Sequence, residues 1–357
     1  MNRLLKIFFV IMWCAMHLHI SAQNSKDSIR SRYFKQRDFG KYFISDIYSP
    51  TPQIQAGAGL NLATYNISPS RTNQYLIYNQ TDFGAELPFF TKVKYNDGLL
   101  KYKFSISTPI CARIWFDFTE PYTAPILNTD FQFAPFELHF LKNVNRKKFK
   151  NFSVKLVPFF HESSHMGDEL TLYKRADSVY NVWVNVSYQT SEIAFTINDM
   201  NGKLANNTSV KLGLKFLLNP QKGWYSIRTE AGDTARSVPS HYWLESYLQL
   251  QNQATRSWLA NDKFIRIASI EIRSRVQYGY PSFTTQYERS ANWANYTNGE
   301  RMNFSVNAYL GWKFNFSNHL VPRFGAYIKF YEGINPYGQF RNLSNYKFLG
   351  ISLIYEN

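Results

Sequence analysis

The sequence predicts an all-β protein: a closed antiparallel transmembrane β-barrel of about twelve strands, roughly 10–14. Long segments alternate between apolar and polar residues, and aromatic residues make up 18% of the 357 residues. After the N-terminal 22 residues, the sequence has no run of about 18 consecutive apolar residues, the length that a transmembrane helix needs. Together these observations favour strands over helices as the membrane-spanning elements.

The clearest alternation covers residues 100–118 and 302–316. Even positions are apolar or aromatic and odd positions are mostly polar or charged, as with Tyr102 and Phe104 against Lys103. A period of two places alternate side chains on opposite faces of a strand. Strands of this length with one apolar face throughout indicate contact with lipid on that face and a polar lumen on the other.

Similar alternation elsewhere completes the set of predicted strands. The remaining ten cover residues 53–65, 83–95, 129–141, 152–163, 181–198, 208–219, 241–252, 263–280, 320–332 and 345–356. Asn96-Asp97-Gly98 and Asn201-Gly202 predict tight hairpins, whereas residues 66–82, 220–240 and 282–300 predict long outer loops.

The N-terminus has the basic, apolar and small-residue order of a secretory signal, which we expect over residues 1–22. Residues 23–50 are polar and predict a short periplasmic segment before a barrel of residues 51–357. Only Cys111 remains after signal removal, which excludes an intrachain disulfide. The expected location is therefore the outer membrane of a Gram-negative cell envelope.

The formal charge is +15, and removal of Arg3 and Lys6 with the signal leaves +13. In an exported protein this charge favours outer-membrane lipids or lipopolysaccharide as partners rather than nucleic acid. The alternative fold is a soluble β-sandwich or ligand-binding barrel, whose strands also alternate. Soluble sheets have shorter strands and expose more Lys and Glu, so the membrane barrel is preferred.

Residues 161–170 concentrate the groups able to move a proton, bind a cation or attack a carbonyl. They are His161, Glu162, Ser163, Ser164, His165, Met166, Gly167, Asp168, Glu169 and Leu170. In an extended chain His161 and Ser163 lie on one face, about 7 Å apart at their Cα atoms. A base beside a hydroxyl is the minimum arrangement for an activated serine.

The alternation of the preceding strand places Lys155, His161 and Ser163 toward the lumen and Phe160 toward lipid, unless a β-bulge at Pro158 resets it. In the lumen the simpler role for His161 is in a polar network. The same alternation places Glu137, His139 and Arg113 there as partners.

His161-Glu162-Ser163 resembles the His-x-Ser pair of two outer-membrane hydrolase families, phospholipase A and the lipid A deacylases. The resemblance implies His161 as general base and Ser163 as nucleophile toward an ester. The chain differs from those families at Ser164, where they carry Asn, and in the predicted orientation, because the enzymes present their pair to lipid.

A longer resemblance combines residues 161–169 with residues 333–340, Gly-Ile-Asn-Pro-Tyr-Gly-Gln-Phe. Together they look like an uncharacterised exported bacterial family, domain of unknown function 1207. The resemblance implies an architecture rather than an activity. Tyr337 and Gln339 are then candidates to approach the His161 cluster, although a tight turn at the rim is the simpler interpretation.

Other members of the segment are weaker candidates. Asp168 and Glu169 are candidate calcium ligands, but one pair of carboxylates supplies few oxygens, so a solvated loop is favoured. His165 is a polar partner or, with His161, a weak zinc pair. We therefore expect no metal and no cofactor, with calcium left open.

Three classes of function remain: an outer-membrane barrel of unassigned activity, a serine-type lipid esterase using Ser163 and His161, and a narrow solute channel or glycolipid-binding barrel. The first is preferred, and the esterase is the sharper hypothesis.

Overall fold

The chain folds into a single sheet of 15 antiparallel strands in a computed structural model. The structure describes residues 46–49, 53–61, 76–96, 99–117, 126–144, 149–166, 183–199, 206–218, 223–229, 232–238, 244–255, 260–261, 263–277, 301–314, 324–333 and 346–356. The predicted signal over residues 1–22 lies outside these ranges.

The strands that follow one another along the chain are mostly hydrogen-bonded neighbours. Their bounds are β1 Gln53–Asn61, β2 Leu76–Asn96, β3 Leu99–Asp117, β4 Ile126–Phe133, β5 Glu137–Asn143, β6 Asn151–Met166, β7 Trp183–Asn198, β8 Asn207–Leu217, β9 Gly223–Thr229, β10 Gly232–Val238, β11 Leu244–Ala254, β12 Phe264–Gln277, β13 Arg301–Phe314, β14 Phe324–Gly333 and β15 Tyr346–Glu356.

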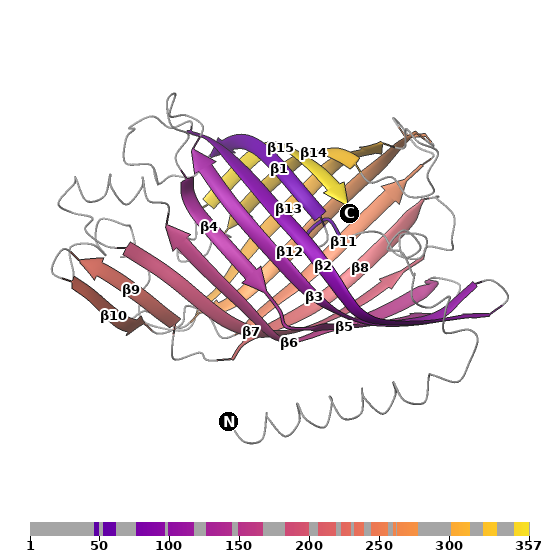
Figure 1. Ribbon diagram of the computed structural model, residues 1–357. Coiled ribbons are helices and arrows are strands. Elements are labelled where there is room, and N and C mark those ends of the chain that lie inside the picture. The colour runs from indigo at the N-terminus through magenta and orange to yellow at the C-terminus, as the bar shows by residue number, and fades with distance from the viewer. Residues whose placement is uncertain are drawn as a thin grey trace, which may run out of the picture.

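Pairing of β1 with β15 closes the sheet into a barrel (Figure 1). β4 and β5 together fill one position between β3 and β6. The β9–β10 hairpin pairs with the N-terminal part of β7, from Trp183 to Ser187. The wall therefore has twelve strand positions, which confirms the predicted antiparallel barrel. Among the described residues, each of the twelve strand positions therefore has a hydrogen-bonded neighbour on both sides.

The structure differs from the predicted strands in three places. β2 begins at Leu76, so it takes in part of the predicted loop 66–82. The predicted strand 129–141 is two strands, because residues 134–136 interrupt it. The predicted loop 220–240 contains β9 and β10.

The outer face of the wall is apolar. Its exposed side chains include Leu212, Leu310, Ile328 and Ile351, and Ile351 reaches 63% exposure. Most of their strand neighbours are buried, among them Tyr309, Tyr327, Lys329 and Ser352, as the predicted alternation requires. Hydrocarbon rather than water suits this surface.

The lumen is filled by ion pairs. Arg273 and Arg275 both bind Glu245, and Lys155 lies 3.6 Å from both Glu137 and Glu192. Around the central cavity of about 210 Å³, the described lining has seven carboxylates and seven cationic side chains. This balance agrees with the polar lumen that the alternation predicts, and it indicates a packed lumen rather than a strongly charged pore.

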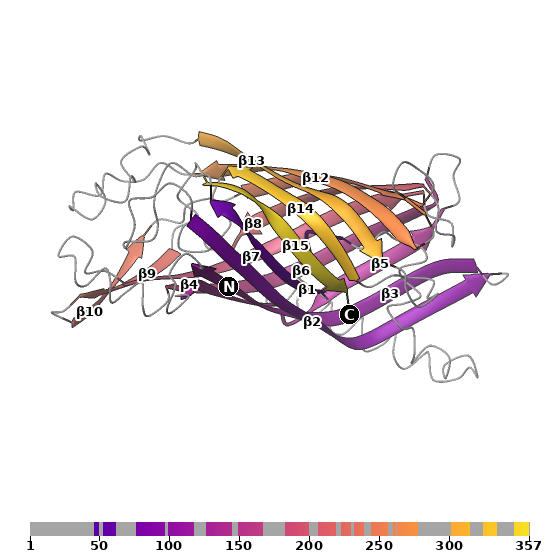
Figure 2. The same ribbon diagram turned by 90° about the horizontal axis from the view of Figure 1, so that it is seen from above.

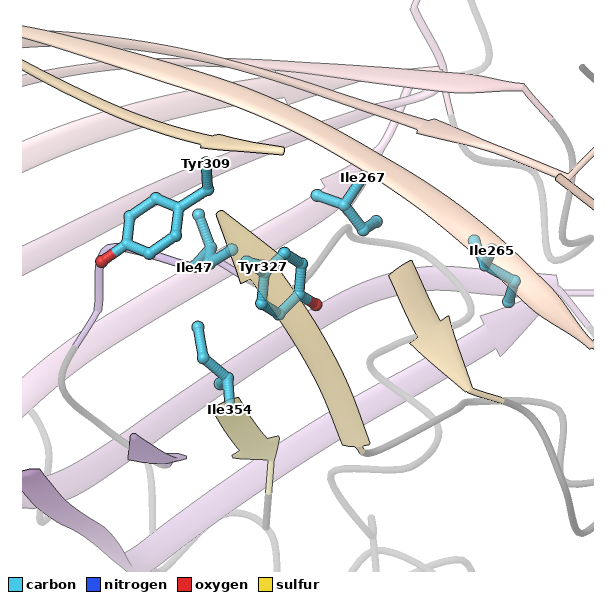
Figure 3. Packing of buried hydrophobic residues seen from close by; sticks show 6 residues of the cluster. All are labelled: Ile47, Ile265, Ile267, Tyr309, Tyr327 and Ile354. Carbon is cyan, nitrogen blue, oxygen red and sulfur yellow. The ribbon is translucent and has the colours of Figure 1, made fainter. Parts of the chain in front are cut away.

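Residues 46–49, the described part of the expected N-terminal segment, lie inside the barrel. Asp46 forms a 2.6 Å ion pair with Lys211, and Tyr48 accepts a hydrogen bond from Ser269. Ile47 packs with Ile265, Ile267, Tyr309, Tyr327 and Ile354 (Figure 3). We call residues 46–49 the strap, because this short segment crosses the lumen and is held at both ends.

Candidate active site

A β-bulge divides β6 into two halves that present opposite residues to the lumen. The pairing with β7 shifts between Val157 and Phe160, so that Pro158 and Phe159 together lie opposite Ser191. Proline lacks the amide hydrogen that a regular ladder requires, which makes it a suitable residue for a bulge. The extra residue reverses the alternation for the rest of the strand.

The consequence is that His161 and Ser163 lie on the outer face. Their direct partners on β4 are Phe133 and Phe131, whose side chains are exposed outside the wall. The expected lumenal orientation of the pair is therefore wrong. Phe160 is also reversed: it lines the central cavity, with Lys215 Nζ 4.9 Å from its ring centre.

On the other side of β6, β7 supplies polar neighbours. Gln189 is directly opposite His161, and Ser187 is directly opposite Ser163. Gln189 is exposed, while Tyr188 and Thr190 on either side of it are buried in the wall. Directly opposite residues bring their Cβ atoms to about 4.5–5.5 Å, so the Gln189 amide lies within side-chain reach of the imidazole.

These four residues form what we call the outer polar site: His161, Ser163, Ser187 and Gln189. It lies on the part of β6 that leads to Met166, the end at which the longer connections join the strands. Sequence reasoning missed Ser187 and Gln189. The alternation of residues 181–198 could have shown that Ser187 and Gln189 share one face of their strand. It could not have shown that this strand pairs with β6 in the register that places them opposite Ser163 and His161.

The inner face of the same part of β6 carries a separate polar cluster. Ser164 donates a 2.9 Å hydrogen bond to Asn128, which in turn donates a 2.7 Å hydrogen bond to Asp130. All three residues are fully buried, and Glu162 beside them is nearly so. Ser164 therefore does not join the outer polar site, because the backbone of the wall separates the two faces.

The other predicted partners are divided between the lumen and undescribed segments. Glu137 faces the lumen and binds Lys155, and His139 shares that face because its partner Ser105 is buried. The expected network of these two residues with His161 is therefore wrong, since His161 lies outside. Asp168, Glu169, Tyr337 and Gln339 lie outside the described residues, and of His165 only the backbone is described.

Gly333 ends β14 with a φ of 134°, a conformation that glycine adopts readily. A side chain there would also collide with Ser305 of β13. The tight turn predicted over residues 333–340 otherwise lies outside the described residues.

Within the described ranges, no three His, Cys, Asp or Glu side chains gather as a metal site would require. Likewise, none of the described segments is a helix of sufficient length and hydrophobicity to cross a membrane.

Comparison with known proteins gives similarities of fold. No protein-family model matches the chain, so the resemblance to domain of unknown function 1207 stays a prediction. No curated protein matches it. Among solved structures, outer membrane phospholipase A from Escherichia coli is 9% identical, with 85% of this chain and 91% of that chain covered and a TM-score of 0.37.

Two further solved structures have a similar fold. The outer membrane phospholipase (OMPLA) dimer of Salmonella typhi with bound calcium is 9% identical, covers 89% of this chain and 96% of its own, and has a TM-score of 0.42. The translocator domain of the autotransporter NalP from Neisseria meningitidis is 10% identical, with 98% and 99% covered and a TM-score of 0.37. At these identities the similarities concern the outer-membrane type of β-barrel fold alone.

Proposed function

We propose that the protein is an outer-membrane β-barrel that hydrolyses an acyl ester of a membrane lipid, with Ser163 as nucleophile and His161 as general base. The supporting observation is that the bulge turns this pair to the apolar outer face of the wall. Polar groups facing hydrocarbon are costly and are usually retained for function.

In the proposed reaction His161 accepts the Ser163 hydroxyl proton while Oγ attacks the ester carbonyl carbon. Collapse of the tetrahedral intermediate breaks the ester bond, and the leaving alcohol takes the proton from His161. Water, deprotonated by His161, then attacks the acyl-serine and releases the fatty acid. Gln189 acts as a positioning residue, its side-chain carbonyl accepting a hydrogen bond from the second imidazole nitrogen.

The neighbours of the pair suggest how the lipid would bind. Phe131 and Phe133 on β4 offer an apolar track for the acyl chain, while Ser187 and Gln189 on β7 offer hydrogen bonds to the ester. Because the site lies toward the long-loop end of the barrel, the proposed substrates are outer-leaflet lipids, either phospholipid or the acyl esters of lipopolysaccharide.

The test measures fatty-acid release from phospholipid and from lipopolysaccharide in mixed micelles, with and without calcium. Ser163→Ala and His161→Ala should each lower kcat by about a thousandfold or more, because the nucleophile and base act as a unit. Two matched controls should retain activity: Ser164→Ala, which changes the opposite face of the same strand, and His139→Ala in the lumen.

Equal activity of the wild type and Ser163→Ala would contradict the proposal. So would the absence of hydrolysis of every lipid ester by folded wild-type protein. Either result would mean that the outer polar site does not catalyse ester hydrolysis.

A further inference from the structure

Among the described residues, several lysines gather at one place on the short-turn end of the barrel. Residues 92–103 and 142–150 hold nine of the 40 Lys and Arg residues and a single acidic residue. Pairing of β3 with both β2 and β5 brings the described parts of these stretches, residues 92–96, 99–103, 142–144 and 149–150, together in the wall. The sequence alone does not reveal this concentration, because some 40 residues separate the two stretches.

The lysines of this surface are exposed. Lys92 and Lys94 lie on β2, Lys101 on β3 and Lys142 on β5, and we call these four residues the basic patch. None of them forms an ion pair with a carboxylate among the residues that the structure describes. This differs from the lumen, where lysines such as Lys155 and Lys211 are paired with carboxylates.

The register across adjacent strands places the patch at a boundary. Lys94, Tyr102, Lys142 and Phe152 pair in succession across β2, β3, β5 and β6. One row farther from the turns, the same outer face carries Lys92, Phe104, Phe140 and Val154. Mixed cationic and aromatic residues that give way to apolar ones are typical of a membrane–water interface.

The β2–β3 hairpin also extends this surface sideways. A register shift between Pro88 and Phe90 bends β2, and Phe89 at the bend is 70% exposed. Figure 2 shows the purple hairpin running past the ends of the neighbouring strands at the right of the view. Lys92, Lys94 and Lys101 on this hairpin have exposed side chains.

We infer that the basic patch binds the anionic headgroups of phospholipids in the leaflet at the short-turn end. Phosphate groups supply the charge complementary to the four lysines, and the aromatic residues suit the adjoining glycerol and acyl region. The inference rests on the membrane location in the proposed function, but not on hydrolysis, since the outer polar site lies toward the opposite end of the barrel.

The experiment reconstitutes the full chain in vesicles of equal parts phosphatidylcholine and phosphatidylglycerol, then measures by native mass spectrometry which lipids the protein retains. The wild type should retain phosphatidylglycerol preferentially. Lys94→Gln with Lys142→Gln should lower that preference by roughly fivefold or more, since each lysine near an anionic surface contributes about that factor.

The matched control is Lys263→Gln with Lys347→Gln, which removes the same charge elsewhere on the barrel. It should retain the preference of the wild type. Equal retention of both lipids by the inserted wild type would overturn this inference and leave the proposed function standing. An equal loss of phosphatidylglycerol preference in both double variants would do the same. Failure of the wild type to insert would overturn both the membrane assignment and this inference.

Discussion

Gln189 on β7 lies directly opposite His161 on β6, with both side chains on the outer face of the wall. This relationship depends on the bulge at Pro158 and Phe159, because a regular β6 would place His161 in the lumen. In the proposed mechanism, Gln189 is the third residue that holds the general base in its orientation.

Gln189→Ala should lower kcat by about 10- to 100-fold with little change in KM, because the imidazole loses its orientation while the lipid still binds. Gln189→Glu should restore most of the rate, since a carboxylate can also accept a hydrogen bond from the imidazole. The measurement is the rate of ester hydrolysis. An unchanged kcat in Gln189→Ala would exclude a positioning role.

The orientation of β6 can be tested without any activity. With Cys111 replaced by alanine, Ser163→Cys in vesicles should react rapidly with a membrane-soluble maleimide. Ser164→Cys should react far more slowly, because Ser164 is fully buried against Asn128. Equal labelling of the two thiols, or faster labelling at position 164, would show that the alternation of β6 is not reversed.

Deletion of Phe159 should remove the bulge and return β6 to regular alternation. Glu162 and Ser164 would then face lipid and His161 the lumen, so the variant should lose hydrolysis and fold poorly, judged by heat-modifiable gel mobility. Pro158→Ala keeps the residue count and should retain both folding and activity. A fully active deletion variant would show that the bulge does not set the orientation of the site.

Glu245→Gln should destabilise the barrel by about 3–5 kcal/mol, since it removes the buried carboxylate that Arg273 and Arg275 share, and Arg273 then keeps only its pair with Glu271. Glu332→Gln breaks an ion pair whose two side chains are 43% and 48% exposed, and should change stability by less than about 1 kcal/mol. Urea unfolding in detergent micelles measures the free energy of unfolding of both variants. Similar losses in the two variants would mean that burial does not set the strength of the lumenal network.

The strap predicts that the wild-type barrel conducts ions poorly in planar bilayers. Asp46→Ala with Tyr48→Ala removes the ion pair to Lys211 and the hydrogen bonds to Ser269 and the Asn307 carbonyl. This variant should show a clear increase in conductance, because the strap fills part of the lumen beside the cavity. Equal conductance of the variant and the wild type would mean that the wall side chains close the lumen by themselves.

The sequence by itself determined the class of fold, about twelve strands and the charged lumen. Those features follow from a period of two and from the preference of aromatic and apolar residues for hydrocarbon, which act along each strand separately. The His161–Ser163 pair was likewise visible as a local motif. Glu137 was predicted inside on the same ground, and the structure confirms it there beside Lys155.

Only the tertiary structure decided which side of the wall the pair faces and what surrounds it. One extra residue in β6 reverses every later side chain, and a bulge is fixed by pairing with β7 rather than by the local pattern. The neighbours Gln189 and Phe133, and the placement of Lys94 and Lys142 on either side of Tyr102, depend on register between strands. Register is a property of the closed sheet, because hydrogen bonding joins residues that are far apart in the chain.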